Sequence, residues 1–140
     1  MRPSQTERYS RQIRLPQVGE AGQHRLLEAR VLIIGMGGLG SPVAMYLTAA
    51  GVGELVISDY DRVDESNLQR QIVHTHASIN ELKADSARET LLRLNPDVSV
   101  TTIDYELDGE ESTDEFNRAD VVVDCTDNFP SRFELNRVSL

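Results

Sequence analysis

The stretch Val31-Leu32-Ile33-Ile34-Gly35-Met36-Gly37-Gly38-Leu39-Gly40 decides the fold of this chain. Its continuous, β-branched start predicts a buried strand over residues 31–34. Apolar residues then recur at helical spacing from Leu39 to Ala50, and Gly51 follows them, so a helix is expected there. The glycines between strand and helix match the pattern GxGxxG in the context that the pattern requires. They predict a tight turn at which four glycines bring backbone amides close to phosphate, namely Gly35, Gly37, Gly38 and Gly40.

Strand and helix patterns alternate along the rest of the chain. Three further apolar runs predict strands, and helices are expected at about 79–94 and after Asn128; the runs are 55–57, 98–103 and 121–123. Runs that are apolar on both faces suit buried parallel strands joined by crossover helices. The prediction is an α/β fold with a Rossmann-like, doubly wound, mostly parallel sheet.

The 140 residues suffice for one domain with its own core. We expect a helical N-terminal arm over residues 1–29 and a Rossmann-like ATP-binding domain over 30–140. The last predicted helix has no closing Gly, Asn or Pro, so the chain is expected to stop inside a larger fold, before the last strands of the sheet.

Charge and composition exclude several classes of protein. The net charge of −9 argues against a surface that binds nucleic acid or an anionic membrane. No apolar run approaches the ~18 residues of a membrane helix, and the first residues lack the apolar core of a secretory signal. Cys125 is the only cysteine, which rules out an internal disulfide or a four-cysteine zinc site and suits the cytoplasm. Seven acids between Asp104 and Glu115 predict a solvated connection.

The residue types of the chain predict an adenine nucleotide as the ligand. Asp59 ends the second predicted strand 19 residues after Gly40, where a carboxylate can accept hydrogen bonds from ribose hydroxyls. The glycine pattern alone favours NAD or FAD. Arg70 and Lys83, on and after a long polar loop, suit a triphosphate whose leaving pyrophosphate needs cations.

Asp127 and Asn128 follow the fourth predicted strand, and ligands of open α/β sheets lie outside such carboxyl ends. Asp127 is therefore the expected ligand of Mg²⁺, which is held by one or two carboxylates together with phosphate oxygens. The alternative is that the pair caps the next helix. Cys125 is interpreted as a packed residue, and His74 and His76 as loop residues rather than metal ligands.

The combined motifs resemble the ThiF/MoeB/HesA family, bacterial relatives of ubiquitin-activating enzymes. The resemblance runs from about residue 7 onward and rests on RYSRQI (8–13), GMGGLG (35–40), DYD (59–61), SNLQRQ (66–71), Lys83 and DCTDN (124–128). It implies a homodimeric adenylyltransferase that uses ATP and Mg²⁺. The implied substrate is the C-terminal Gly-Gly carboxylate of a ubiquitin-like sulfur carrier, either MoaD in molybdopterin synthesis or ThiS in thiamin synthesis.

The resemblance also implies roles for single residues. Arg11 would reach the ATP of the opposite subunit, and Asp127 would act on Mg²⁺ and the transition state. The catalytic set is completed by Arg70 and Lys83. The expected nucleotide contacts are the four glycines, Asp59, Asp61, Ser66, Asn67, Leu68, Gln69, Arg70, Lys83, Asp127 and Asn128.

This chain departs from the family pattern by lacking the second half, with its two CxxC pairs for structural Zn²⁺ and its groove for the carrier tail. Zn²⁺ is accordingly expected only in that missing part, and this chain alone is expected to be inactive. Three other hypotheses stay open: an NAD- or FAD-dependent oxidoreductase, a non-catalytic ATP-binding module that needs another chain, and the tRNA-modifying dehydratase branch. The SNLQRQ and DCTDN motifs favour the sulfur-carrier branch over the last of these.

Overall fold

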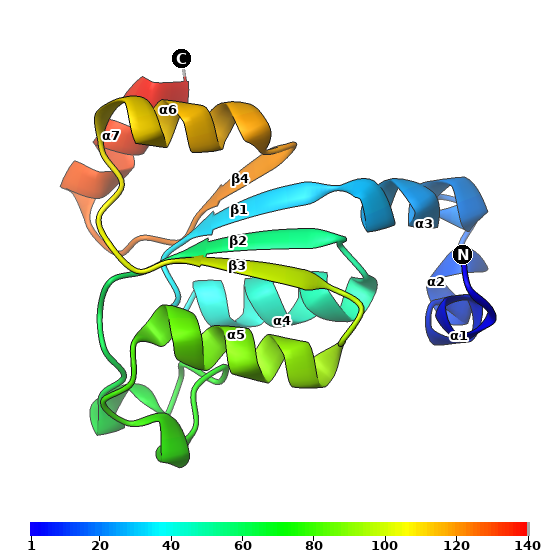
Figure 1. Ribbon diagram of the computed structural model, residues 1–140, viewed down its shortest axis with the longest axis horizontal. Coiled ribbons are helices and arrows are strands. Elements are labelled where there is room, and N and C mark those ends of the chain that lie inside the picture. The colour runs from blue at the N-terminus through cyan, green and yellow to red at the C-terminus, as the bar shows by residue number, and fades with distance from the viewer. Residues whose placement is uncertain (140) are drawn as a thin grey trace.

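The computed structural model describes residues 1–139, and the side chains of all of these except residues 129–131, 133 and 134. In this part of the chain, four parallel strands form a sheet in the order β3-β2-β1-β4 (Figure 1). Their bounds are β1 Arg30–Ile34, β2 Glu54–Ser58, β3 Ser99–Ile103 and β4 Val121–Asp124. The predicted Rossmann-like α/β fold is confirmed.

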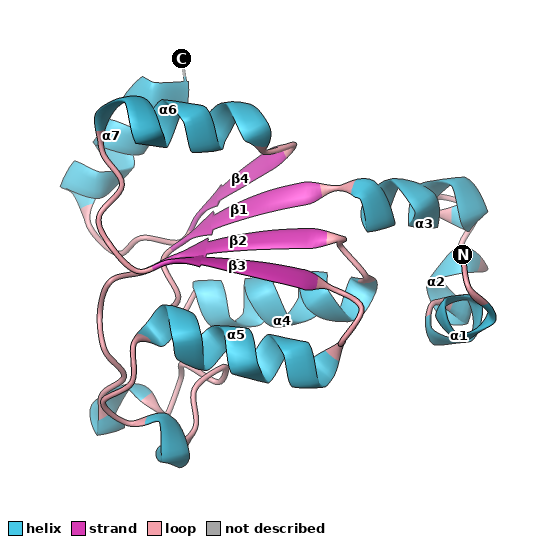
Figure 2. Cartoon of the chain, viewed as in Figure 1, coloured by secondary structure: helices cyan, strands magenta, loops and turns pink. Residues whose placement is uncertain are grey.

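Helices cover both faces of the sheet (Figure 2). Helices α4 (Gly40–Ala50) and α5 (Lys83–Leu94) lie on one face, and α6 (Gly109–Arg118) and α7 (Phe129–Ser139) lie on the other. The long connection from β2 to α5 contains two short turns of 3₁₀ helix, η1 (Glu65–Asn67) and η2 (His76–Ser78). No helix in the described residues is long and apolar enough to cross a membrane.

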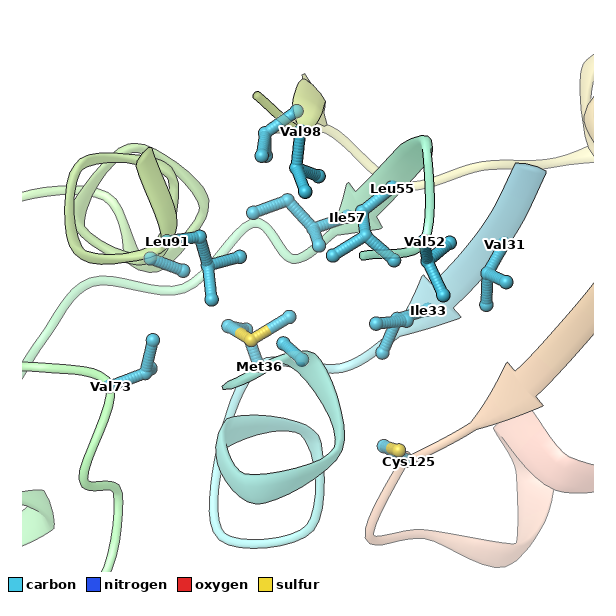
Figure 3. Packing of buried hydrophobic residues seen from close by; sticks show 13 residues of the cluster. Val31, Ile33, Met36, Val52, Leu55, Ile57, Val73, Leu91, Val98 and Cys125 are labelled. Carbon is cyan, nitrogen blue, oxygen red and sulfur yellow. The ribbon is translucent and has the colours of Figure 1, made fainter. Parts of the chain in front are cut away.

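The core follows from the alternation of side chains along each strand. Ile33 and Ile57 face α4 and α5 and pack there with Leu91 (Figure 3), whereas Leu32 faces α6. All four side chains are fully buried, and each such burial contributes about 1.5–3 kcal/mol. Apolar residues on both sides of β1 therefore make it the centre of a two-faced core.

The N-terminal arm comprises α1 (Pro3–Arg8), α2 (Ser10–Ile13) and α3 (Gly19–Glu28), and it lies at the amino end of the sheet (Figure 1). Its main anchor is Tyr9, the residue between α1 and α2 in the chain. Tyr9 is buried, and its hydroxyl oxygen accepts a hydrogen bond from Asn95 Nδ2 at 2.8 Å. Three exposed arginines lie on or directly after the two short helices that Tyr9 separates: Arg8, Arg11 and Arg14.

Two predictions from the sequence were wrong about helices. The acidic segment, expected to be a connection, contains most of α6. The sequence shows no helical apolar pattern there, because Phe116 is the one apolar residue of α6 that packs against the sheet in the described structure. Acidic residues in its first turn suit the positive end of the helix dipole. The helix expected from about residue 79 begins at Lys83, because Leu82 is extended and bridges to Arg62.

Gly40 offers a test of the turn between β1 and α4. A Cβ at this position would lie 2.0 Å from the Gly35 carbonyl oxygen, so Gly40→Ala must push the backbone apart. We expect a loss of about 1–3 kcal/mol in the free energy of unfolding, measured in urea. Gly38→Ala is the matched control, because its nearest neighbour would be Arg70 Cδ at 3.9 Å, an ordinary contact. Equal stability of the two variants would contradict the described turn.

Candidate functional site

A pocket of about 780 Å³ opens at the carboxyl ends of β1, β2 and β4. The chain proceeds from β1 to β2 on one side and crosses from β3 to β4 on the other side of β1. The pocket therefore lies at the point where the strand order reverses, which is where open α/β sheets bind ligands. Its volume is in the range of small-molecule sites.

The glycine loop forms the wall between β1 and α4 with residues 35–39. Gly40, also predicted to contact the nucleotide, is buried behind this loop and does not line the pocket. Gly35 has φ +96°, and a Cβ there would meet the Cys125 carbonyl oxygen at 2.6 Å, so only glycine fits. In the described structure the amides of Gly37, Gly38 and Leu39 have no hydrogen-bond acceptor. Unpaired amides at a helix start are suited to an anion such as a phosphate.

Asp59 lies at the end of β2 and lines the pocket, as the ribose prediction requires. One of its carboxylate oxygens accepts from the Met36 amide at 2.8 Å and the other from the Asp61 amide at 2.8 Å. Each oxygen keeps a second lone pair for a ligand hydroxyl. The carboxylate thus holds the glycine loop and remains able to bind ribose, and the exposed Asp61 lies beside it in the pocket.

Arg70 and Lys83 bring two cations to the same pocket. Lys83 is the first residue of α5 and is 8% exposed. Arg70 is exposed, and its Nη1 donates to the Ser66 carbonyl oxygen at 3.3 Å. Neither cation forms an ion pair within residues 1–139. Cations that are not held in ion pairs can bind an anionic ligand with several phosphates.

The other predicted loop residues do not line this pocket: Ser66, Asn67, Leu68 and Gln69. Two of them instead shape the turn at η1. Asp64 Oδ1 accepts from the Ser66 amide at 2.9 Å and hydroxyl at 2.6 Å, and these bonds lower the pKa of Asp64. The Asn67 carbonyl oxygen accepts from the amides of Arg70 and Gln71. In this structure the turn presents Arg70 to the pocket.

Asp127 and Asn128 face the pocket from the loop that follows β4. Asp127 is exposed, with Asn128 Nδ2 at 3.5 Å from its Oδ1. The loop is braced because Thr126 donates twice to Asp124 Oδ1 and accepts from the Arg132 guanidinium at 2.9 and 3.2 Å. An exposed carboxylate in the same pocket as unpaired amides and two cations fits Mg²⁺ shared with a phosphate. Among the described residues, no cluster of three metal-binding side chains provides an all-protein site.

Arg11 is not brought to the pocket of its own chain. It lies on α2 at the amino end of the sheet, whereas the pocket lies at the carboxyl end (Figure 1). Cys125 is buried, as predicted, and burial raises the pKa of its thiol.

Comparison with known proteins identifies the family from which this arrangement comes. Residues 9–140 match the ThiF family. The chain belongs to the ThiF family. It is 51% identical over 129 residues to the sulfur carrier protein ThiS adenylyltransferase of Escherichia coli K12, covering 92% of this chain and 51% of that protein. It is 45% identical over 130 residues to the molybdopterin-synthase adenylyltransferase of Haemophilus influenzae, covering 93% of this chain and 54% of that protein.

A solved structure of similar fold is the E. coli tRNA N6-threonylcarbamoyladenosine dehydratase TcdA in complex with ATP. The TM-score is 0.82 at 26% identity, and the match covers 90% of this chain and 51% of that chain. The present ThiF-family chain spans about half the length of the curated relatives it matches.

Several pocket residues of this ThiF-family chain were not predicted. Gln71 is 5% exposed, lines the pocket, and its Oε1 is buried without a partner in the described structure. Its position next to Arg70 was the available signal. Five more come from the β3–α6 connection, α6 and α7, and no motif marks them: Glu106, Leu107, Ser112, Leu135 and Val138.

Proposed function

We propose that this chain is the ATP-binding part of an adenylyltransferase that activates a ubiquitin-like sulfur carrier of the MoaD or ThiS kind. The observation that carries the proposal is that two cations without an ion pair in the described structure, Arg70 and Lys83, line one pocket together with the unpaired glycine-loop amides. A dinucleotide has only a pyrophosphate to hold, which a helix start largely does, whereas a triphosphate uses the additional cations.

The names of the relatives support the choice of carrier. Identity is 51% to a ThiS adenylyltransferase and 45% to a molybdopterin-synthase adenylyltransferase, against 26% to the tRNA dehydratase. The motifs present here are shared by the thiamin and molybdopterin branches, so both carriers belong to the proposal. The NAD- or FAD-dependent oxidoreductase is the disfavoured alternative.

In the proposed reaction, a carboxylate oxygen of the carrier bonds to the α-phosphorus of ATP. The bond from that phosphorus to the bridging oxygen breaks, which yields a carrier acyl-adenylate and pyrophosphate. The chain holds the reactants in line and neutralises the leaving group, so no side-chain nucleophile is needed. Mg²⁺, when bound, would spread the charge of the phosphate oxygens.

Each pocket residue has a part in this proposal. The amides of Gly37 and Gly38 bind phosphate oxygens, Arg70 and Lys83 neutralise the departing pyrophosphate, and Asp59 accepts from ribose hydroxyls. Asp127 holds the metal, and Asn128 contacts the nucleotide beside it. The turn containing Ser66, Asn67, Leu68 and Gln69 would close on the triphosphate. A homodimer in the cytoplasm, in which Arg11 serves the partner's ATP, completes the proposal.

Isotope exchange between pyrophosphate and ATP tests the function directly. We expect exchange only when a carrier that ends in Gly-Gly is present, because the adenylated carboxylate belongs to the carrier. A carrier that lacks the final glycine is the matched control and should support none. Tight binding of NAD or FAD, with no effect of ATP on thermal unfolding, would favour the oxidoreductase. Stabilisation by ATP with exchange only after another chain is added would favour the non-catalytic module.

A further inference from the structure

One peptide segment of the glycine loop is held from both sides. The Met36 amide donates to Asp59 Oδ2 at 2.8 Å, and the Met36 carbonyl oxygen lies 2.9 Å from His74 Nε2. The Met36 side chain is itself fully buried in the core (Figure 3). Since Met36 directly precedes Gly37 and Gly38, these contacts determine where the unpaired amides of the loop point.

Both contacts continue to helix α5. On one side, the Asp61 amide donates to Asp59 Oδ1, and the Asp61 carbonyl oxygen accepts from the Lys83 amide at 2.9 Å. On the other side, His74 Nδ1 lies 2.8 Å from Ser86 Oγ, one helical turn after Lys83. The glycine loop and the start of α5 are therefore joined by two separate bridges.

The histidine bridge has a defined protonation pattern. A carbonyl oxygen only accepts, so Nε2 carries the proton that it donates to Met36, and neutral Nδ1 accepts from the Ser86 hydroxyl. His74 is 4% exposed and Ser86 is 3% exposed. Burial lowers the pKa of His74, and the nearby Lys83 charge acts in the same direction, which keeps the ring neutral.

We propose that His74 is a positioning residue, which sets the spacing between the glycine-loop amides and Lys83 to fit the phosphates of ATP. The inference rests on the proposed function, because it assigns the pocket to a triphosphate. His74 touches no ligand in this scheme: it acts through Met36 on one side and through Ser86 on the other. The consequence is specific: loss of the bridge should lower the affinity for the phosphates of ATP and leave the affinity for adenosine unchanged.

Two substitutions at residue 74 separate the positioning contact from the ring. A glutamine amide extends about as far as His Nε2 and can still donate to the Met36 carbonyl oxygen, whereas an asparagine amide extends only to the position of Nδ1. We expect His74→Asn to weaken ATP binding about tenfold and adenosine binding less than about twofold by calorimetry, and His74→Gln to restore most of the ATP affinity.

Two further variants control for lost stability. Val73→Ala removes two methyl groups from a fully buried side chain next to His74 and keeps every hydrogen-bonding group of the bridge. It should lower stability and leave ATP affinity unchanged. Ser86→Ala removes only the hydroxyl, and it should weaken ATP binding about threefold even if His74→Asn fails to fold.

The positioning role is overturned if ATP and adenosine affinities fall together, if His74→Gln binds ATP no better than His74→Asn, or if Ser86→Ala binds ATP like the unchanged protein. These binding measurements need no carrier. Failure of the positioning role with intact carrier-dependent exchange would therefore leave the proposed function standing. If the variants lose ATP affinity as expected but no carrier-dependent exchange occurs, the proposed function is overturned and the positioning role stands.

Discussion

Replacing Asp127 with alanine is expected to reduce carrier-dependent pyrophosphate exchange about 10²- to 10³-fold. The reason is the position of this carboxylate on the pocket wall formed by the β4–α7 loop, in the same pocket as the unpaired amides of the glycine loop. In the proposed reaction, negative charge accumulates on the leaving pyrophosphate, and Asp127 holds the metal that offsets it. Removing a group that acts mainly in the transition state lowers the rate more than it lowers ATP affinity.

Controls separate charge from folding. Asp127 is exposed, and its one described hydrogen bond, from Asn128, is long at 3.5 Å, so the free energy of unfolding should change little. Asp127→Asn keeps the size of the side chain and removes the charge, and it should lose exchange like the alanine variant. Asp114→Ala removes the same charge from the exposed surface of α6, outside the pocket, and should keep full activity. Unchanged exchange in Asp127→Ala would show that the role assigned to it is wrong.

Much of the architecture was predictable because it depends on local patterns. Continuous β-branched runs identify buried strands, and parallel strands place all of their carboxyl ends at one edge of the sheet. For this reason Gly35, Asp59 and Asp127, which are far apart in the sequence, were expected together, and the pocket contains all three. The order of these residues along the chain was sufficient, without knowledge of any side-chain contact.

Other features depend on contacts that no local pattern records. Helix α6 has no apolar periodicity that would predict it, because Phe116 is the one apolar residue of this helix that packs in the core of the described structure. Asp59 was expected to bind ribose, but its bonds to the amides of Met36 and Asp61 follow from backbone geometry after β2. The His74 bridge joins residues that are 38 and 12 positions away in the chain, so a histidine in a polar loop gave no sign of it. Burial, rather than residue type, distinguishes His74 from the exposed His76.

Arg11→Ala is expected to inactivate the protein by itself and to regain activity when mixed with Asp127→Ala. Arg11 is exposed on α2 at the end of the sheet opposite the pocket, so it cannot serve the ATP site of its own chain without a large rearrangement (Figure 1). In a homodimer that combines Arg11 of one subunit with Asp127 of the other, a mixed dimer contains one complete site and one doubly defective site.

Random exchange of subunits makes half of the dimers mixed, so the mixture should recover about a quarter of the wild-type exchange rate. Arg11→Ala alone should lose about 10³-fold if Arg11 acts as an arginine finger. Differently tagged subunits verify that mixed dimers form, and Arg14→Ala, a neighbouring exposed cation, is the matched control that should stay active. Full activity of Arg11→Ala, or no recovery in verified mixed dimers, would contradict a site shared between subunits. Recovery to the expected level would mean that Arg11, a basic residue of an acidic chain, completes the neighbouring subunit's site.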